Sequence, residues 1–148
     1  NDVKVLTANI TDKNLVLKEA IGLEKPLAII YNYNGFGYGV FPLDGNNLND
    51  IASLKDEVAR ASAYSNLYEN TLIGNIAPNE AFDCFLKGIQ TEENELVLGI
   101  LTSQTNSIFW KFLTEKQQQQ RQEELELRRR SCTCLPDQPL PGHGRKTL

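Results

Sequence analysis

Residues 56–88, DEVARASAYSNLYENTLIGNIAPNEAFDCFLKG, decide the fold, because they predict two helices joined by a tight turn. Asp56 is a good N-cap residue for the first helix, since its carboxylate can accept a backbone N–H of the first turn. Gly74-Asn75 is typical of residues that end a helix, because glycine adopts the left-handed conformation without strain. The side chains expected on the inward face of this helix are Val58, Ala61, Ser65, Tyr68 and Leu72.

The second helix is predicted to begin near Pro78, because proline suits a first turn, where its missing N–H breaks no hydrogen bond. Its apolar residues recur at helical spacing, so we expect four of them inward: Ala81, Phe82, Phe85 and Leu86. Gly88 falls near the predicted end. Cys84 lies within the same pattern, and we interpret it as a buried thiol that behaves as a small hydrophobic side chain.

Helical patterns continue on both sides of this pair. Before it, Leu48, Ile51 and Ala52 predict a short helix. After it, Thr91 and Asn94-Glu95 signal the start of a longer helix, with a break expected near Thr105-Asn106. The side chains that mark this longer helix are Leu96, Ile100, Leu101, Phe109 and Trp110.

A further helix is predicted after Thr114, because Gln117 follows it at the spacing of a capping box. Consecutive antiparallel helices with short connections are typical of a solenoid-like stack of helical hairpins. We therefore assign residues 45–130 to the beginning of an α-helical repeat domain.

The first 44 residues predict strands. Val3 and Val5, and then Leu15 and Leu17, alternate with polar residues as in half-buried strands, and the segment between these pairs has turn chemistry. The apolar run after Pro26 predicts a better-buried strand. The fold class expected is therefore α+β, with a partial antiparallel β-sandwich over residues 1–44 followed by the helical hairpins.

The tail differs from the rest of the chain. Residues 1–110 hold seven basic and fourteen acidic residues, whereas residues 111–148 hold eight basic and five acidic residues. Residues 131–148 lack periodicity and are interrupted by proline and glycine, so they predict a disordered or non-native tail. A natural disordered tail and a foreign or frame-shifted sequence both fit this composition.

Composition narrows the functional classes. The chain has 148 residues, a formal charge of -4 and no apolar run long enough to span a membrane, and no signal peptide is predicted in it. The acidic balance argues against nucleic acid as a partner. The absence of methionine indicates either that a start was trimmed away or that the chain begins within a longer protein. His143 is the one histidine, so we expect neither a zinc site nor a nucleophile–histidine site.

Several motifs invite a chemical interpretation, and a structural one is favoured for each. The glycine-rich segment 34–39 lies between two strand patterns and lacks the spacing of a dinucleotide fingerprint, so it predicts a turn. Glu92, Glu93 and Glu95 predict a solvated helix N-terminus. Phe109, Trp110 and Phe112 predict packed aromatic side chains, and arginines 128–130 predict a solvated helix end. Three cysteines are a poor disulfide framework, and the spacing of Cys132 and Cys134 is tighter than in the usual zinc motif. Asn9-Ile10-Thr11 is a glycosylation sequon, which matters only in a secreted protein.

The passage that ends a strand at Asn32 and continues through residues 37–44, GYGVFPLD, resembles aminopeptidase N-like zinc metallopeptidases. In that family it lies where a small β-sandwich domain meets the C-terminal helical domain. The passages that follow are also similar to the family: residues 56–60, 67–70 (LYEN), 74–78 (GNIAP), 82–95 and 110–113 (WKFL). The resemblance covers roughly residues 3–125.

The resemblance implies a parent enzyme that removes N-terminal residues from peptides with the help of a zinc ion. The family's His-Glu-x-x-His helix and Gly-x-Met-Glu-Asn loop are both missing from this sequence. The chain is therefore expected to be a non-catalytic C-terminal portion without cofactor or site residues of its own. Its implied partners are the catalytic domain of the parent and, through that domain, the peptide substrate.

Two other interpretations remain open from the sequence. The chain could be a stand-alone helical-repeat module that binds a protein or peptide, which explains the scarcity of histidine equally well. It could also be a carbohydrate-binding sandwich with a helical appendage, in which case Tyr31, Tyr33, Phe36 and Tyr38 would have to form a flat platform.

Overall fold

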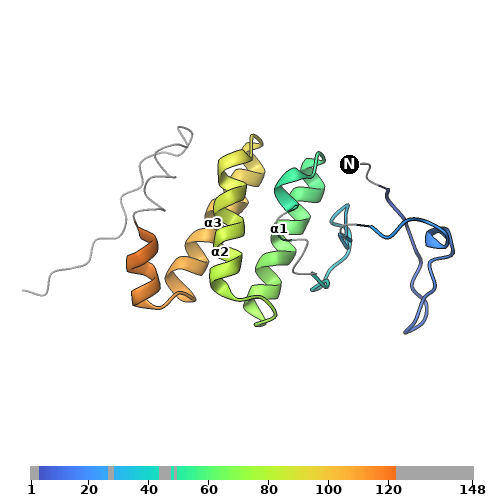
Figure 1. The fold of residues 1–148 in the computed structure, drawn as a ribbon, viewed down its shortest axis with the longest axis horizontal. Coiled ribbons are helices and arrows are strands. Elements are labelled where there is room, and N and C mark those ends of the chain that lie inside the picture. The colour runs from blue at the N-terminus through green and yellow to red at the C-terminus, as the bar shows by residue number, and fades with distance from the viewer. Residues whose placement is uncertain (1–3, 27–28, 44–47, 49, 123–148) are drawn as a thin grey trace, which may run out of the picture.

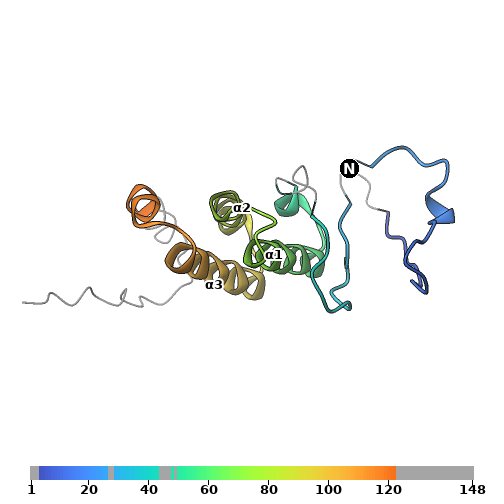
Figure 2. The same ribbon diagram turned by 90° about the horizontal axis from the view of Figure 1, so that it is seen from below.

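The computed structural model describes residues 4–26, 29–43, 48 and 50–122. Three α-helices dominate this part of the chain: α1 (Glu57–Leu72), α2 (Pro78–Thr91) and α3 (Glu95–Lys111). Two short 3-10 helices, η1 (Lys18–Ala20) and η3 (Ile51–Ser53), precede them, and residues 115–122 are again helical. Consecutive α-helices run in alternating directions and lie side by side (Figures 1 and 2).

The predicted α+β fold class is wrong for the described part of the chain, which contains helices and no strand. In place of the partial β-sandwich over residues 1–44, two irregular segments are found. We call residues 4–26 the arm and residues 29–43 the strap. Leu15 and Leu17, predicted to be half-buried, are 44% and 40% exposed. A lone extended segment cannot form a strand without a neighbour that completes its hydrogen bonds.

Helix α1 begins and ends at the predicted residues. The Asp56 carboxylate accepts the Ala59 N–H at 2.7 Å, which satisfies a first-turn donor. Gly74 adopts a φ of +79°. The Asn75 N–H then bonds the Asn70 carbonyl at 2.9 Å and the Gly74 N–H bonds the Thr71 carbonyl at 3.1 Å, which is the Schellman arrangement.

The predicted inward face of α1 is wrong at both of its ends and only partly right between them, where Ala61 and Tyr68 are half-buried and pack against the core. Val58 is 52% exposed and Leu72 is 41% exposed. The buried residues are instead Ala59, Ala63, Tyr64, Asn66, Leu67, Asn70 and Thr71. Two different surfaces of helix α1 are buried: one packs against the other helices, and the strap covers a stripe of polar side chains. Because part of the buried surface is polar, the spacing of apolar residues does not identify it.

Helix α2 agrees with its prediction. Pro78 occupies the first turn, and the four predicted inward side chains, Ala81, Phe82, Phe85 and Leu86, are at most 1% exposed. Gly88 packs against the Tyr64 ring so closely that a Cβ at this position would lie 2.7 Å from the ring carbon Cζ. The aromatic core between α1 and α2 therefore depends on a glycine near the end of α2.

Helix α3 is continuous, so the predicted break near Thr105-Asn106 is wrong. Thr105 is buried and its hydroxyl donates to the Leu101 carbonyl at 2.7 Å, so its polar group finds a partner within the helix and no break is needed to satisfy it. The predicted cap is confirmed, because the Asn94 side chain accepts the Leu96 and Val97 N–H groups at 3.0 and 3.2 Å.

The predicted capping box at Thr114 is also confirmed. The Thr114 N–H donates to Gln117 Oε1 at 2.8 Å, and the Gln117 N–H donates to the Thr114 hydroxyl at 3.4 Å. The next helical segment therefore starts immediately afterwards.

The helices share one core. Aromatic rings link its parts, with Tyr64 and Phe85 centred 5.9 Å apart and Phe82 and Phe109 also 5.9 Å apart. Residues 115–122 attach to α2 through Arg121, which pairs with Asp83 and lies 5.4 Å above the Phe82 ring. The arm lies away from this core, beyond the strap (Figures 1 and 2).

Candidate functional site

Polar side chains of α1 bind the strap at two places, Asn32 in the turn of the strap and Phe41 near its C-terminal end. Ser62, Asn66 and Asn70 are spaced four residues apart, so they form one stripe along α1. The Ser62 hydroxyl donates to the Asn32 carbonyl at 2.7 Å, and the two asparagines hold the backbone of Phe41. We call Asn32, Phe41, Ser62, Asn66 and Asn70 the joint.

Asn66 binds the Phe41 backbone at both of its polar groups. Its Oδ1 accepts the Phe41 N–H at 2.8 Å and its Nδ2 donates to the Phe41 carbonyl at 2.8 Å. Asn70 Nδ2 donates to the same carbonyl at 2.8 Å, while its Oδ1 accepts from Asn75 at 3.0 Å. Asn66 and Asn70 are 7% and 2% exposed, so losing the strap would leave nearly buried amides without partners.

A second asparagine contact of the same kind closes the turn of the strap. Asn32 Oδ1 accepts the Gly37 N–H, at 2.6 Å, and Asn32 Nδ2 donates to the Gly37 carbonyl, at 3.0 Å. Gly37 lies close to the Phe41 ring, since a Cβ there would be 2.7 Å from the ring carbon Cζ and the ring would have to shift. Gly35 has a φ of +71°, and its N–H bonds the Asn32 carbonyl at 2.9 Å. The prediction of a glycine-permitted turn is confirmed.

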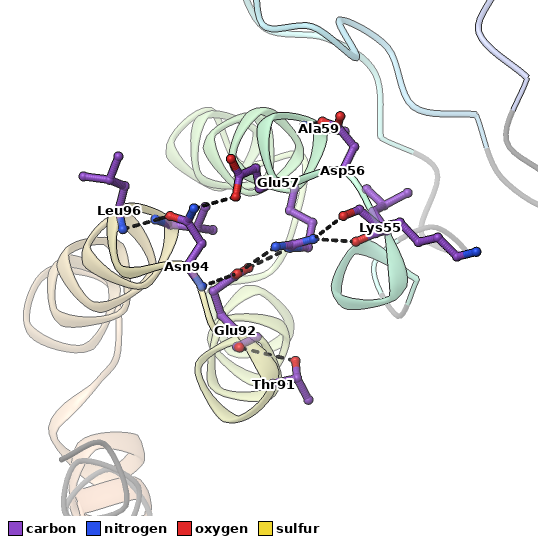
Figure 3. A network of polar contacts seen from close by, with 12 residues as sticks. Lys55, Asp56, Glu57, Ala59, Thr91, Glu92, Asn94 and Leu96 are labelled. Atoms are coloured by element: carbon purple, nitrogen blue, oxygen red, sulfur yellow. Dashed lines mark hydrogen bonds and ion pairs between the residues drawn. The ribbon is translucent and has the colours of Figure 1, made fainter. Parts of the chain in front are cut away.

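A charged network lies at the N-terminal end of α1, where η3, α1 and the start of α3 meet (Figure 3). Arg60 binds Glu92 through two hydrogen bonds of 2.7 and 2.8 Å and also donates to the carbonyls of Leu54 and Lys55 at 2.7 and 3.0 Å. Glu92 Oε1 accepts the Asn94 N–H at 3.0 Å. Figure 3 shows Glu92, Asn94 and Glu57 around this point, and Asn94 Nδ2 donates to Glu57 at 2.6 Å.

The prediction that Glu92 is a solvated carboxylate is wrong, whereas Glu93 and Glu95 are exposed as expected. The Glu92 side chain is 2% exposed, and its hydrogen bonds with Arg60 lower the pKa of its carboxyl below the usual value, against the opposing effect of burial. The residue type alone favoured the solvated interpretation, because the arginine partner lies 32 positions away.

Cys84 packs against the core, as the sequence predicted. Its Sγ lies 3.0 Å from the Leu48 carbonyl oxygen, and it donates the S–H to that oxygen. Burial raises the pKa of the Cys84 thiol to about 11, so the thiolate is not formed at neutral pH. Burial likewise raises the pKa of the Tyr64 hydroxyl.

The other motif residues are dispersed. Phe109 is buried in the core as predicted, whereas Trp110 is 45% exposed and packs edge-on against the Phe109 ring at 4.9 Å. Residues 9–11 of the sequon are exposed. Arginines 128–130, Cys132, Cys134 and His143 lie outside the described residues.

No three histidine, cysteine or carboxylate side chains in the described residues are grouped as a metal would require. No helix in residues 4–26, 29–43 or 50–122 combines the length and the apolar character needed to cross a membrane.

Comparisons with protein-family models, with curated proteins and with solved structures found no match to this chain. The family resemblance therefore depends on the sequence passages named above alone.

Proposed function

We propose that this chain is a non-catalytic part of a zinc aminopeptidase, in which the helices help to cover the cleft above the active site of a catalytic domain. The chain does not fit the zinc site itself, since one histidine cannot provide a His-Glu-x-x-His pair of ligands. Its own contribution is to bind the catalytic domain and to restrict the cleft to small peptides.

The joint carries this proposal. The family-like residues are dispersed over more than 40 positions, yet several of them meet at one place. Phe41 from passage 37–44 is held by Asn70 from passage 67–70, and Asn70 is held in turn by Asn75 from passage 74–78. A connection between a preceding domain and a helical domain needs such contacts, because they fix how the chain enters the helices.

The exposed apolar side chains support the same proposal. Among the described residues, most of the exposed large hydrophobic side chains lie between Val5 and Val40, in the arm and strap. Exposed apolar surface on this scale is typical of a protein–protein contact. The arm and strap are therefore expected to pack on another part of the parent protein.

The first test is to read the coding DNA before the codon for Asn1. A continuous frame that encodes His-Glu-x-x-His and a downstream glutamate is the expected result. A stop codon or start codon immediately before Asn1 would overturn the proposal. If the frame is found, the complete protein should release N-terminal residues from peptides, and a chelator should abolish that activity.

The second candidate is a stand-alone helical module that binds extended peptides. The stripe of Ser62, Asn66 and Asn70 favours this candidate, because these side chains bind backbone atoms of the strap. Such contacts would hold an extended peptide whatever its side chains are. A stand-alone module should be a monomer that unfolds in one cooperative transition. Association of the isolated chain through the arm would argue for the first candidate instead.

A further inference from the structure

The strap is attached to the helical part by a contact that is separate from the aromatic rings of the core. In the joint, side chains of α1 bind backbone groups of the strap. Ile30 and Leu43, near the two ends of the strap, pack against the core. The arm lies beyond the strap and away from the helices (Figures 1 and 2). The joint and these two apolar side chains therefore attach the strap to the helices.

Release of the strap would leave polar groups on α1 that need partners. Asn66 and Asn70 are 7% and 2% exposed, and both donate to the Phe41 carbonyl. A nearly buried amide without a hydrogen-bond partner is costly, because neither protein nor water then satisfies it. A stripe that has lost its strap therefore favours the binding of a strap, whichever chain supplies it.

Both halves of this contact occur in every copy of the chain. The strap of a second copy offers the same Asn32 carbonyl and the same Phe41 backbone groups, so the hydrogen bonds of the joint can form between two chains. Charge does not oppose this contact, because residues 26–43 include no charged residue and the stripe consists of serine and asparagine. The formal charge of -4 is carried by other parts of the chain.

We propose that the stripe of one chain binds the strap of a second copy, so that two chains exchange residues 29–43 reciprocally. Such an exchange is a low-cost route to a dimer, because each chain regains the contacts that it gave up. The strap of the same chain competes at an effective concentration of about 1 mM, as is usual for a short connection. Exchange should therefore become favourable as the chain concentration approaches about 1 mM. The inference does not depend on which parent protein contains the chain.

Two defective chains that complement each other test the exchange. Asn66→Ala damages the stripe and leaves the strap intact. Phe41→Pro damages the strap, because proline lacks the N–H that Asn66 binds, and it leaves the stripe intact. Neither chain can form the complete joint alone, whereas the strap of N66A can bind the stripe of F41P.

Amide hydrogen exchange at Phe41 measures this complementation, because only the N66A chain has that amide. Isotope-labelled N66A is measured alone and with an equal amount of unlabelled F41P, each at about 1 mM. Exchange at Phe41 should slow by at least about threefold in the mixture. Unlabelled N66A in place of F41P is the control, since it has the same arm but no intact stripe, and it should cause no slowing.

A second recipient keeps the test valid if F41P does not fold. Leu43→Asp also damages the strap, because aspartate cannot pack against the core in place of leucine, and it leaves the stripe unchanged. Circular dichroism shows whether the α-helices, which begin at Glu57, are folded in each variant. Sedimentation equilibrium should find pairs of chains in each mixture of N66A with a folded recipient.

Two results would overturn the inference. Unchanged exchange at Phe41 with a folded recipient would show that a stripe does not bind the strap of another chain. Equal slowing in the N66A control would assign the protection to association through the arm. Slowing with F41P or L43D, and none in the control, would establish that the strap is exchanged between copies.

Discussion

At the scale of single residues, Gly88 leaves less room for an added Cβ than any other glycine in the part of the chain that the structure describes, because the Tyr64 ring lies against it. Gly88→Ala should lower the free energy of unfolding by about 2 kcal/mol, because the added methyl group overlaps a ring that is 1% exposed and packs against Phe85. Gly99→Ala is the control, since nothing lies within 4 Å of its added carbon, and it should stabilise α3 by up to about 1 kcal/mol. Urea unfolding measures both, and equal effects of the two changes would contradict this account.

Asn66 is the other residue on which much depends. Asn66→Ala removes both hydrogen bonds to the Phe41 backbone. The free energy of unfolding should fall by about 2 kcal/mol, because the partly buried N–H and carbonyl of Phe41 lose these bonds. The Phe41 amide should also exchange faster with solvent. Asn34→Ala, at an exposed position of the same strap, should change neither quantity. If Phe41 exchanged equally fast in the parent chain and in N66A, the joint would not hold the strap in solution.

At the scale of helices, the Arg60–Glu92 pair connects α1 to the end of α2. Because the pair lowers the pKa of Glu92 in the folded chain, its stabilising effect is complete above the unfolded pKa of about 4.3. It is lost as the pH falls through the lower, folded value. Unfolding measured between pH 7 and pH 3 should therefore show a loss of stability below about pH 4.3 that is smaller in Glu92→Gln.

The control for this experiment is Glu93→Gln, at the neighbouring exposed carboxylate. At neutral pH, E92Q should already be destabilised by about 2 kcal/mol, because Arg60 loses its charged partner, and E93Q should be close to the unchanged chain. Parallel pH curves for the parent chain and E92Q would show that Glu92 titrates equally in both states.

The helices are also where sequence-based prediction succeeded. Asp56, Gly74, Pro78, Asn94 and the Thr114–Gln117 pair mark the ends of helices through local chemistry, and local chemistry is visible in the sequence. The inward face of α1 was not predictable in this way, because its buried asparagines bind a segment some 25 positions earlier. The role of Glu92 escaped prediction for the same reason.

At the scale of the whole molecule, the arm and strap contrast with the well-packed helices. The alternation at Leu15 and Leu17 can produce a strand only where a second strand pairs with it. The described residues contain no such second strand. Alternation of apolar and polar side chains therefore indicates that a segment is suited to a strand. Whether the strand forms depends on another segment that pairs with it. The joint could not be predicted either, since asparagine spacing alone does not identify a bound backbone.

The exposed apolar side chains of the arm lead to a prediction for the isolated chain. The chain should self-associate at high concentration and bind a hydrophobic dye, because Leu15, Leu17 and Ile21 offer apolar surface to solvent. Changing Leu15, Leu17 and Ile21 together to Asn should reduce both effects without shifting the melting temperature of the helices. Sedimentation and thermal unfolding measure the two quantities. A drop in melting temperature would show that the arm packs on the core.

The joint also determines how mechanical force would travel through the chain. A pull on the arm reaches the strap first, and the strap is bonded near the middle of α1, whereas the covalent chain enters that helix only at Glu57. Along the chain, the asparagine contacts at Phe41 therefore come before the first core residue of the helical part, Ile51 in η3, so they stand between a pull on the arm and the aromatic core.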